Sequence, residues 1–263
     1  MGYAWLMTAS DRPAVLVTGG AWRLGRAIVT AFGEQGWHVV IHYRRSGAAA
    51  HELAARLPST ETVACDLADG DTAVDMIANL AARLPDWRVL VNCASIFEND
   101  SVTALDPATN TRAMQINATS PARMAQAYLA SAQSAAGRCV IQVTDQKIAN
   151  PNPDFFSYTM SKHALAATVP MLAMAAPRAQ DRVYGLAPGA ILPSHDQSEA
   201  ETDISHRLNL LGRKTTKEDV AEAAMFLASG AMATGQTLFC DSGQHLLAQA
   251  RDVIFLAREG TGE

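Results

Sequence analysis

The strongest signal for the fold is the stretch PAVLVTGGAWRLG, residues 13–25. Its first part, residues 13–18, is a short apolar, β-branched run, which is typical of a buried parallel strand. Two glycines follow, and a helical pattern then runs from about Leu24 to Gln35, with Gly36 as a stop signal. A strand that turns through glycines into a helix offers backbone N–H groups and a helix N-terminus to a pyrophosphate. The stretch therefore predicts a nucleotide-binding βα unit.

The glycines of this loop do not form the standard G-x-G-x-x-G pattern. Gly19 and Gly25 are spaced as in a G-x-x-x-G-x-G loop, but Arg23 occupies the position of the middle glycine. The letters alone are a weak motif. Their position between the first strand and the first helix strengthens the interpretation.

The rest of the chain alternates short apolar runs with helical patterns. Strands are expected near residues 37–43, 62–65, 88–92, 138–144, 182–187 and 237–240, and helices near 48–57, 71–84, 112–135, 157–174 and 218–227. The last of these helices is expected to begin with a capping box formed by Thr215 and Glu218. Such alternation predicts right-handed βαβ units and one α/β domain, residues 1–263, with a single Rossmann-like, doubly wound parallel sheet. Residues 1–12 are expected to be a loose tail, and the long irregular stretch 188–213 a substrate loop.

Composition excludes several classes of function. With 21 basic and 26 acidic residues the net charge is −5, so general affinity for nucleic acid or an anionic membrane is not expected. No apolar run is long enough for a transmembrane helix, and the first residues do not resemble a signal peptide. The four cysteines are far apart in the sequence, which favours buried thiols in a reducing cytoplasm over disulfides or metal ligands.

The end of the second predicted strand indicates which cofactor is bound. A site for NAD commonly has an acidic residue there to hold the ribose 2′-hydroxyl. This chain has Tyr43-Arg44-Arg45-Ser46 instead, with no acid before Glu52. Two arginines and a hydroxyl, with Arg23 as a further cation, offer charge-assisted donors to a 2′-phosphate. The segment favours NADPH over NADH, and a solvated basic patch is the alternative.

Further polar residues follow the third and fourth predicted strands. Asp66 could accept a hydrogen bond from an adenine amino group, and Asn92-Cys93-Ala94-Ser95 lies where strand ends line the cofactor crevice. Asn117 lies within a predicted helix although asparagine is a poor helix former. An exposed polar position or a functional one would both explain it.

Tyr158 and Lys162 form a candidate catalytic pair. They are four residues apart, so on a helix they share one face. An ammonium group near a phenol favours the phenolate and can bring a pKa of roughly 10 toward working pH. Such a tyrosine could donate a proton during reduction of a C=O or C=N bond. Because Y-x-x-x-K also occurs by chance in many helices, the pair needs support from the rest of the chain.

That support comes from a resemblance to the short-chain dehydrogenase/reductase family over nearly the whole chain. The resemblance rests on motifs in the family's order and spacing: Thr18-Gly19…Gly25, Asn92-Cys93-Ala94, Asn117, Tyr158 with Lys162, Pro188-Gly189, and Thr234-Gly235…Asp241-Ser242-Gly243. It implies a Rossmann-like fold, a nicotinamide cofactor and a homotetramer.

The departures from the common family pattern point to a subgroup. Asp145 stands where the family usually has a serine that holds a substrate carbonyl, and Thr144 is the nearest hydroxyl. Arg23 in the glycine loop, the H-Y-x-R-S segment and N-x-A-S-x-F are further departures. Together they resemble pteridine reductases and the related bacterial dihydromonapterin/dihydrofolate reductases.

The resemblance assigns roles residue by residue. Tyr158 would donate the proton with Asp145 as its partner, Lys162 would bind the nicotinamide ribose, and Asn117 would help to hold a water relay. Phe97 would stack on the pterin ring, Ser95 would contact substrate or cofactor, and Arg23 would lie near the phosphates and the pterin edge. The full set expected to bind NADPH is Gly19, Arg23, Leu24, Gly25, Tyr43, Arg44, Arg45, Ser46, Asp66, Leu67, Asn92, Ala94, Ser95, Lys162, Pro188 and Gly189.

An ionised Asp145 would raise the pKa of Tyr158, so activity is expected to fall as pH rises through the apparent pKa of the pair. A turn residue is the alternative role for Asp145. Two other functions remain open: a generic reductase of ketones or 3-oxoacyl thioesters, against which Asp145 argues, and a non-catalytic protein, against which Tyr158 and Lys162 argue. The sequence suggests no function for residues 246–263.

Overall fold

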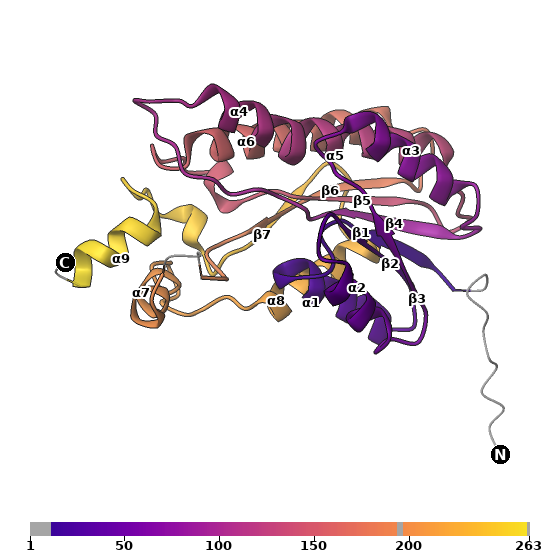
Figure 1. Cartoon of the computed structure of the whole chain (residues 1–263), viewed down its shortest axis with the longest axis horizontal. Coiled ribbons are helices and arrows are strands. Elements are labelled where there is room, and N and C mark those ends of the chain that lie inside the picture. The colour runs from indigo at the N-terminus through magenta and orange to yellow at the C-terminus, as the bar shows by residue number, and fades with distance from the viewer. Residues whose placement is uncertain (1–11, 194–196, 262–263) are drawn as a thin grey trace, which may run out of the picture.

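The computed structural model describes residues 12–193 and 197–261. Its centre is an all-parallel sheet in the order β3-β2-β1-β4-β5-β6-β7 (Figure 1), which confirms the predicted fold class. The strands are β1 (Ala14–Val17), β2 (His38–Tyr43), β3 (Thr60–Ala64), β4 (Trp87–Asn92), β5 (Cys139–Val143), β6 (Arg182–Pro188) and β7 (Thr237–Cys240).

Helices cover both faces of this sheet (Figure 1). They are α1 (Arg23–Glu34), α2 (Gly47–Ala54), α3 (Gly70–Ala81), α4 (Pro107–Met114), α5 (Ser120–Ser131), α6 (Phe156–Ala175), α7 (Glu199–Ser205), α8 (Lys217–Ala228) and α9 (Val253–Thr261). Alternate strand residues enter different cores: Val15 and Val17 pack on the side of α1 and α8, whereas Leu16 packs on the side of α3 and α5. Burial on both faces explains why the strands are continuous apolar runs.

The helix expected over residues 112–135 is interrupted. After α4 the chain forms a π-helical turn, Gln115–Thr119, before α5 begins. Asn117 lies in this turn, and its side chain is fully buried and bonded to the backbone of Ile96. A π-helical turn inside a helix is rare and often marks a functional position.

The expected capping box is displaced by one residue. The Thr216 side chain accepts a bond from the Asp219 backbone N–H at 3.1 Å, and the Asp219 carboxylate accepts one from the Thr216 N–H at 2.8 Å. Thr215 instead shares a hydrogen bond of 2.7 Å with Ser242. The side chain of Thr215 is therefore used in a tertiary contact, which sequence spacing does not reveal.

The predicted substrate loop contains a helix of its own. Within residues 188–213, α7 begins at a capping box made by Ser198 and Glu201. The C-terminal helix α9 packs against α7, and the two lie next to each other in Figure 1. The predicted tail falls outside the described residues except for Arg12, which donates to the Gly36 carbonyl at 2.8 Å. None of the described helices combines the length and apolar character needed to cross a membrane.

Candidate active site

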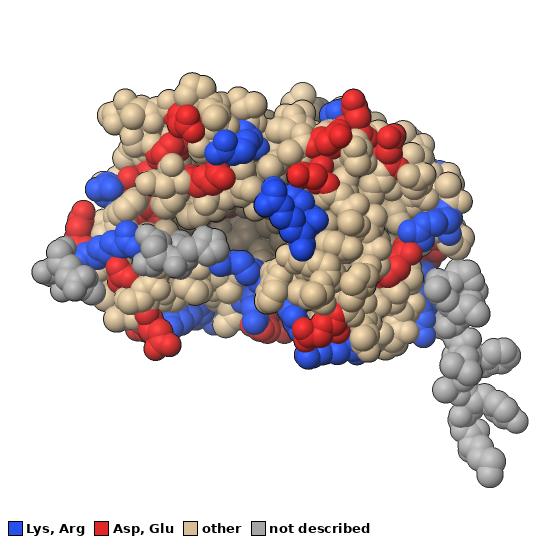
Figure 2. All heavy atoms as spheres, viewed as in Figure 1, with Lys and Arg blue, Asp and Glu red and all other residues tan. Residues whose placement is uncertain are grey.

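The candidate site lies where the parallel strands end. Segments 18–25, 43–46, 92–97 and 188–189 follow the carboxyl ends of β1, β2, β4 and β6, which meet at one edge of the sheet. Figure 2 shows the surface hollowed between the two helical layers, with Lys and Arg side chains at the rim. Ligands of open α/β sheets bind at this edge.

The glycine loop is closed tightly on itself. Gly19 has a φ of +65°, and a Cβ at Gly25 would lie 2.2 Å from the Gly19 carbonyl oxygen. Arg23 has a φ of +53°, a left-handed conformation that favours glycine. Arg23, which occupies the position of the middle glycine in the G-x-x-x-G-x-G pattern, therefore has the backbone conformation that a glycine would adopt there. Its guanidinium donates to the Pro193 carbonyl at 3.0 Å and links the phosphate loop to the substrate loop.

His42 supports the glycine loop through hydrogen bonds, a role that the sequence did not predict. The Gly19 N–H donates to His42 Nδ1 at 3.0 Å, so Nδ1 must be unprotonated. The ring proton is therefore on Nε2, which lies 3.0 Å from the Cys65 carbonyl oxygen. Burial lowers the pKa of His42 to about 4, although the Cys65 contact opposes the change. A neutral imidazole thus joins the ends of β1, β2 and β3.

Thr18 makes the equivalent connection to β4. Its hydroxyl oxygen accepts bonds from the N–H groups of Cys93 and Ala94 at 2.9 and 3.0 Å. The Asn92 side chain is buried and turned into the protein, where it donates to the Pro121 carbonyl and to Gln142. Asn92 therefore supports this end of β4 through its side chain, and only its backbone remains for a cofactor.

The arginines expected to bind the 2′-phosphate are exposed to solvent. Arg44 and Arg45 are exposed, and within the described residues neither has an ion-pair partner. Ser46 precedes α2 without capping it, and Tyr43 is half-buried. Uncompensated guanidinium groups at the end of β2 fit a site for an added phosphate.

The adenine side is less distinctive. Asp66 is exposed, and one of its oxygens accepts the Ala68 N–H at 3.0 Å. Leu67 is buried, and its carbonyl accepts the Ser120 hydroxyl at 2.7 Å. Asp66 keeps its other carboxylate oxygen for a ligand.

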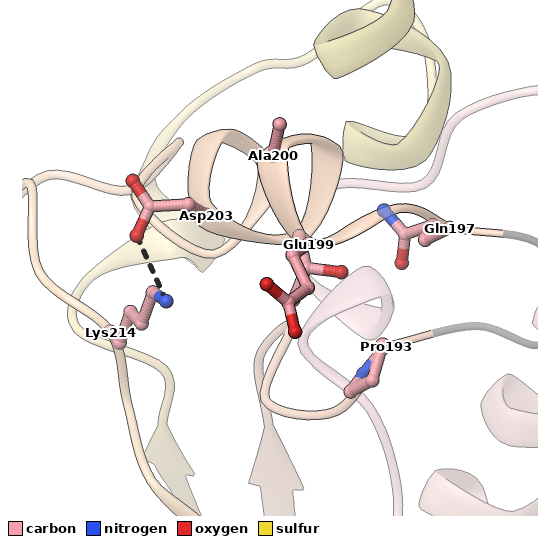
Figure 3. A pocket seen from close by; sticks show the side chains of 7 residues that line it. Pro193, Gln197, Glu199, Ala200, Asp203 and Lys214 are labelled. Carbon is pink, nitrogen blue, oxygen red and sulfur yellow. Dashed lines mark ion pairs between the residues drawn. The ribbon is translucent and has the colours of Figure 1, made fainter.

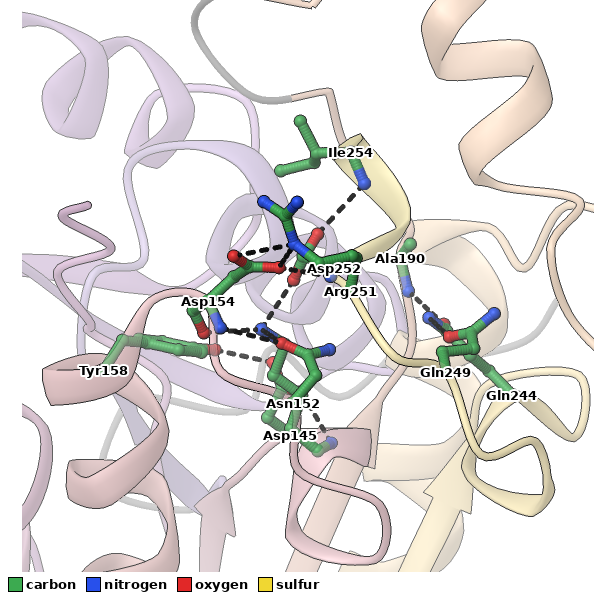
Figure 4. Close-up of polar contacts among 11 residues, drawn as sticks. Asp145, Asn152, Asp154, Tyr158, Ala190, Gln244, Gln249, Arg251, Asp252 and Ile254 are labelled. Carbon is green, nitrogen blue, oxygen red and sulfur yellow. Dashed lines mark hydrogen bonds and ion pairs between the residues drawn. The ribbon is translucent and has the colours of Figure 1, made fainter. Parts of the chain in front are cut away.

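Tyr158, Lys162 and Asp145, the candidate catalytic residues, lie close together in the structure. Tyr158 and Lys162 lie on α6, and the Tyr158 hydroxyl donates to Asp145 Oδ2 at 2.6 Å (Figure 4). The Lys162 ammonium donates to the Val143 carbonyl at 2.8 Å and lies 5.7 Å from the centre of the Tyr158 ring. Asp145 follows β5 directly, and its other oxygen accepts the Lys147 N–H at 2.9 Å.

The electrostatics of this cluster correct one expectation. Burial, followed by the Asp145 charge, raises the pKa of Tyr158 well above its ordinary value, so Lys162 does not bring it toward neutrality here. Burial also lowers the pKa of Lys162. The pKa of Asp145 is raised by burial, against the opposing bond from Lys147. The raised pKa lets the Asp145 carboxyl group hold a proton more readily than an exposed aspartate does.

Asn117 fixes the segment that leads to Phe97. Its amide group donates to the Ile96 carbonyl at 2.9 Å and to the Ser161 hydroxyl at 3.0 Å, and its oxygen accepts the Ile96 N–H at 2.8 Å. Both amide hydrogens are therefore used. A water relay at Asn117 would have to use its backbone.

Phe97 lies beside Tyr158. The two rings meet edge to face with centroids 4.7 Å apart, and Phe97 is 41% exposed. Its other neighbour is Phe155, which stacks on it at 4.0 Å and which sequence reasoning missed. Phe155 has a φ of +54°, so its backbone is strained next to the candidate catalytic tyrosine. Ser95, near this ring in sequence, is exposed.

Pro188 and Gly189 lie at the end of β6, at the edge of the candidate site. Pro188 ends β6, and the Gly189 N–H donates to the Cys240 carbonyl at 3.2 Å. A Cβ on Gly189 would lie 2.8 Å from the Asp241 side chain, so no larger residue fits. Ser242 has a φ of +53°.

A separate cavity of about 530 Å³ lies within the substrate loop (Figure 3). Its lining residues are Pro193, Gln197, Glu199, Ala200, Thr202, Asp203 and Lys214. Neither Tyr158 nor Asp145 lines it, so this cavity is not where the predicted chemistry takes place. The described residues contain no cluster of three or more His, Cys, Asp or Glu side chains arranged to hold a metal ion.

A parallel sheet, a glycine loop at its first βα turn and a Tyr–Lys pair at the strand ends define a Rossmann-type, nucleotide-dependent oxidoreductase. Comparison with known proteins specifies the family. A family model described as enoyl-(acyl carrier protein) reductase matches residues 19–245. The chain belongs to the short-chain dehydrogenase/reductase family and is an NAD(P)-dependent reductase.

Several relatives are similar over nearly their whole length. Pteridine reductase 1 of Leishmania tarentolae is 28% identical, with 92% of this chain and 99% of the relative covered. A putative ketoacyl reductase of the granaticin polyketide synthase from Streptomyces violaceoruber is also 28% identical, over 91% and 98%. The crystal structure of FolM alternative dihydrofolate reductase 1 from Brucella canis, complexed with NADP, is 31% identical with a TM-score of 0.85, over 94% and 99%.

Proposed function

We propose that this protein uses NADPH to reduce a dihydropterin, such as dihydromonapterin or dihydrobiopterin, or dihydrofolate. The observation that carries the proposal is the 2.6 Å hydrogen bond from the Tyr158 hydroxyl to the Asp145 carboxylate. A serine at this position would suit a ketone oxygen, which only accepts hydrogen bonds. A carboxyl group suits a pterin, because the pterin amino group and ring N–H are donors and a ring nitrogen must be protonated.

The residues present fit NADPH. The glycine loop leads into the N-terminus of α1, where a pyrophosphate would be attracted, and Arg44 and Arg45 offer cations to a 2′-phosphate. Lys162 would hold the nicotinamide ribose. Bound NADPH would supply the hydride that is added to the carbon of the substrate C=N bond.

The protein's own task is then to deliver a proton to the adjacent nitrogen. Tyr158 would donate it, and a protonated Asp145 would return a proton to the phenolate across their hydrogen bond. Asp145 is half-buried, so it can be reprotonated from solvent. Phe97 would stack on the flat ring of the substrate, and Ser95 and Arg23 would contact its edge.

The proposal agrees with the names of relatives, which include a pteridine reductase and an alternative dihydrofolate reductase. A homotetramer in the cytoplasm is also proposed, on the family resemblance and on the widely spaced free cysteines. Sedimentation of the purified protein would test the assembly.

The direct test is NADPH oxidation with dihydromonapterin, dihydrobiopterin, dihydrofolate and a panel of ketones. Turnover with a pterin or folate is expected. Turnover confined to ketones would instead establish the generic carbonyl reductase, and no turnover with any compound would favour a non-catalytic protein.

A substitution tests whether the Asp145 carboxyl group is what selects a pterin as the substrate. Asp145→Ser should reduce pterin turnover by at least about 100-fold, because positioned acid–base groups contribute that much. NADPH affinity, measured by fluorescence titration, should stay unchanged. Full pterin activity in this variant would show that the carboxyl group is not what selects the substrate.

A further inference from the structure

The C-terminal segment, residues 247–261, is fastened next to the catalytic residues (Figure 4). Arg251 Nε donates to both carboxylate oxygens of Asp154, at 3.1 and 2.8 Å. The Asp252 N–H donates to the same carboxylate at 2.8 Å, and Asp252 is only 5% exposed. Two consecutive residues thus attach this segment to the loop that precedes Tyr158.

Lys147 connects the segment to Asp145. Its ammonium group contacts Asp252 Oδ2 at 2.6 Å, Asn152 Oδ1 at 3.1 Å and the Asp154 carbonyl at 3.2 Å, which uses all three of its hydrogens. The backbone N–H of the same lysine donates to Asp145 at 2.9 Å. One residue therefore contacts the catalytic carboxyl group through its backbone and the C-terminal segment through its side chain.

The segment also extends the aromatic wall of the site. Phe255 of α9 is stacked on Phe155 with centroids 6.0 Å apart, and Phe155 stacks in turn on Phe97. The Lys147 ammonium lies 5.2 Å from the centre of the Phe155 ring. The Lys147–Asp252 ion pair thus supports Asp145, and the stacked rings of Phe255 and Phe155 support Phe97.

A third contact reaches the substrate loop. Gln249 of the segment donates to the Leu208 carbonyl at 2.8 Å, and Gln244, which precedes the segment, accepts the Ala190 N–H at 2.9 Å. The C-terminal segment therefore contacts the loop expected to cover the substrate directly, and it is linked to Asp145 through Lys147.

We propose that Asp252 is a positioning residue of the active site, which acts through Lys147 to hold the Asp145 carboxyl group and to balance the charge beside it. This inference rests on the proposed role of Asp145 in proton delivery. It gives residues 247–261, for which the sequence suggests no function, a place in the chemistry.

Charged and titratable groups from several elements face the Tyr158–Asp145 pair. They are Lys162 on α6, Cys93 after β4, Lys147 after β5, and Asp252. Asp154, which is paired with Arg251, contacts Lys147 through its carbonyl oxygen. Burial, then the Asp145 charge, raises the pKa of Tyr158, and Asp252 adds to that rise. The pKa of Asp145 is raised by burial and is held back by Lys147. Asp252 and Lys147 therefore act on the pair with opposite signs.

Opposite signs give a test that loss of packing would not imitate. In Asp252→Asn, removal of a negative charge makes the ionised pair easier to form. The alkaline limb of the pH profile of turnover should move to lower pH by about one unit. In Lys147→Met the backbone N–H remains but a positive charge is lost, so the limb should move to higher pH by a similar amount.

The matched control is a second buried ion pair among the residues that the structure describes. Arg138 and Asp181 lie 2.6 Å apart at the opposite end of β5, with side chains 2% and 0% exposed. Asp181→Asn breaks that pair and should leave the pH profile unchanged. Shifts in the same direction for Asp252→Asn and Lys147→Met, or profiles that match the control, would overturn the proposal.

Single variants of a buried pair can fail to fold. The double variant Lys147→Met/Asp252→Leu removes both charges and should keep the wild-type midpoint with lower turnover. A midpoint displaced by about one unit in this variant would also overturn the proposal.

A measurement without substrate separates this inference from the proposed function. The infrared band of the protonated Asp145 carboxyl group, assigned by its loss in Asp145→Asn, should titrate with the same opposite shifts in the NADP-bound protein. If these shifts appear while no pterin is reduced, the proposed function fails and the positioning role of Asp252 stands. If pterins are reduced but the band does not shift, Asp252 is not a positioning residue.

Discussion

The cofactor end and the substrate end of this site are built differently. At the cofactor end, Thr18, Gly19 and His42 connect strand ends that already lie side by side in the sheet. At the substrate end, Asp145 and Tyr158 depend on residues such as Asp252, which are distant in the sequence and lie outside the sheet. The register of the sheet fixes the first region, and side-chain contacts fix the second. Substitutions at the substrate end should therefore reduce turnover while the fold is kept.

Backbone strain occurs at both ends. Arg23 at the cofactor end and Phe155 at the substrate end have φ values of +53° and +54°. A left-handed conformation costs a non-glycine residue about 1–2 kcal/mol. Arg23 is linked to the substrate loop through Pro193, and Phe155 supports Phe97. In each case the strained residue makes a contact that glycine could not make.

The largest effect is expected from Tyr158→Phe, which removes the proposed proton donor and little else. Turnover should fall by about 100- to 10,000-fold, whereas NADPH affinity, which depends on the other end, should hold. Tyr184→Phe is the matched control, because the Tyr184 hydroxyl is bonded to the Met232 carbonyl away from the site. Stopped-flow turnover and cofactor titration measure the two quantities. A loss of affinity as large as the loss of turnover would contradict the division between the two ends.

A smaller effect, confined to the cofactor end, is expected from the double variant Arg44→Ser/Arg45→Ser. Hydrogen bonds to charged groups contribute about 1.5–3 kcal/mol, so kcat/KM for NADPH should fall roughly 10- to 100-fold. The value for NADH should change little, because NADH lacks the 2′-phosphate. Arg56→Ser, an exposed arginine after α2 that pairs with Glu52, should leave both values unchanged. An equal fall in kcat/KM for NADPH and for NADH would contradict the assignment of Arg44 and Arg45 to the 2′-phosphate.

The regular part of the molecule could be predicted because its signals are local. Each strand is an apolar run that ends at a turn, and the order of strands follows from the βαβ rule. The Tyr158–Lys162 pair could be predicted because four residues define one helix face. Asp145 could be placed beside them only because the family resemblance supplied the spacing.

The remaining parts depend on contacts that no short pattern encodes. Lys147 and Asp252 are more than a hundred residues apart in the sequence and become partners only after the C-terminal segment folds back. The interruption of the helix at Asn117 reflects its bonds to Ile96, which lies in another loop. His42 could not be assigned a role from the sequence, because nothing in the sequence shows that Gly19 lies against its ring.

His42 also provides the smallest predicted effect, and the one that tests how the cofactor end is held together. Burial lowers its pKa to about 4 from an unfolded value of 6.5. The unfolded chain therefore binds a proton between these values that the folded protein does not, so stability falls as pH decreases from 6.5 toward 4. Between pH 7 and pH 5 this group alone should remove about 2 kcal/mol from the free energy of unfolding.

His42→Asn isolates that contribution. The asparagine side chain has an oxygen that can accept the Gly19 N–H, but it does not titrate. Urea unfolding at pH 7 and pH 5 should show a smaller loss of stability in the variant than in the wild type, by about 2 kcal/mol. If both proteins lose the same amount, His42 is not held neutral against the glycine loop. The cofactor end would then owe its shape to the sheet register and Thr18 alone.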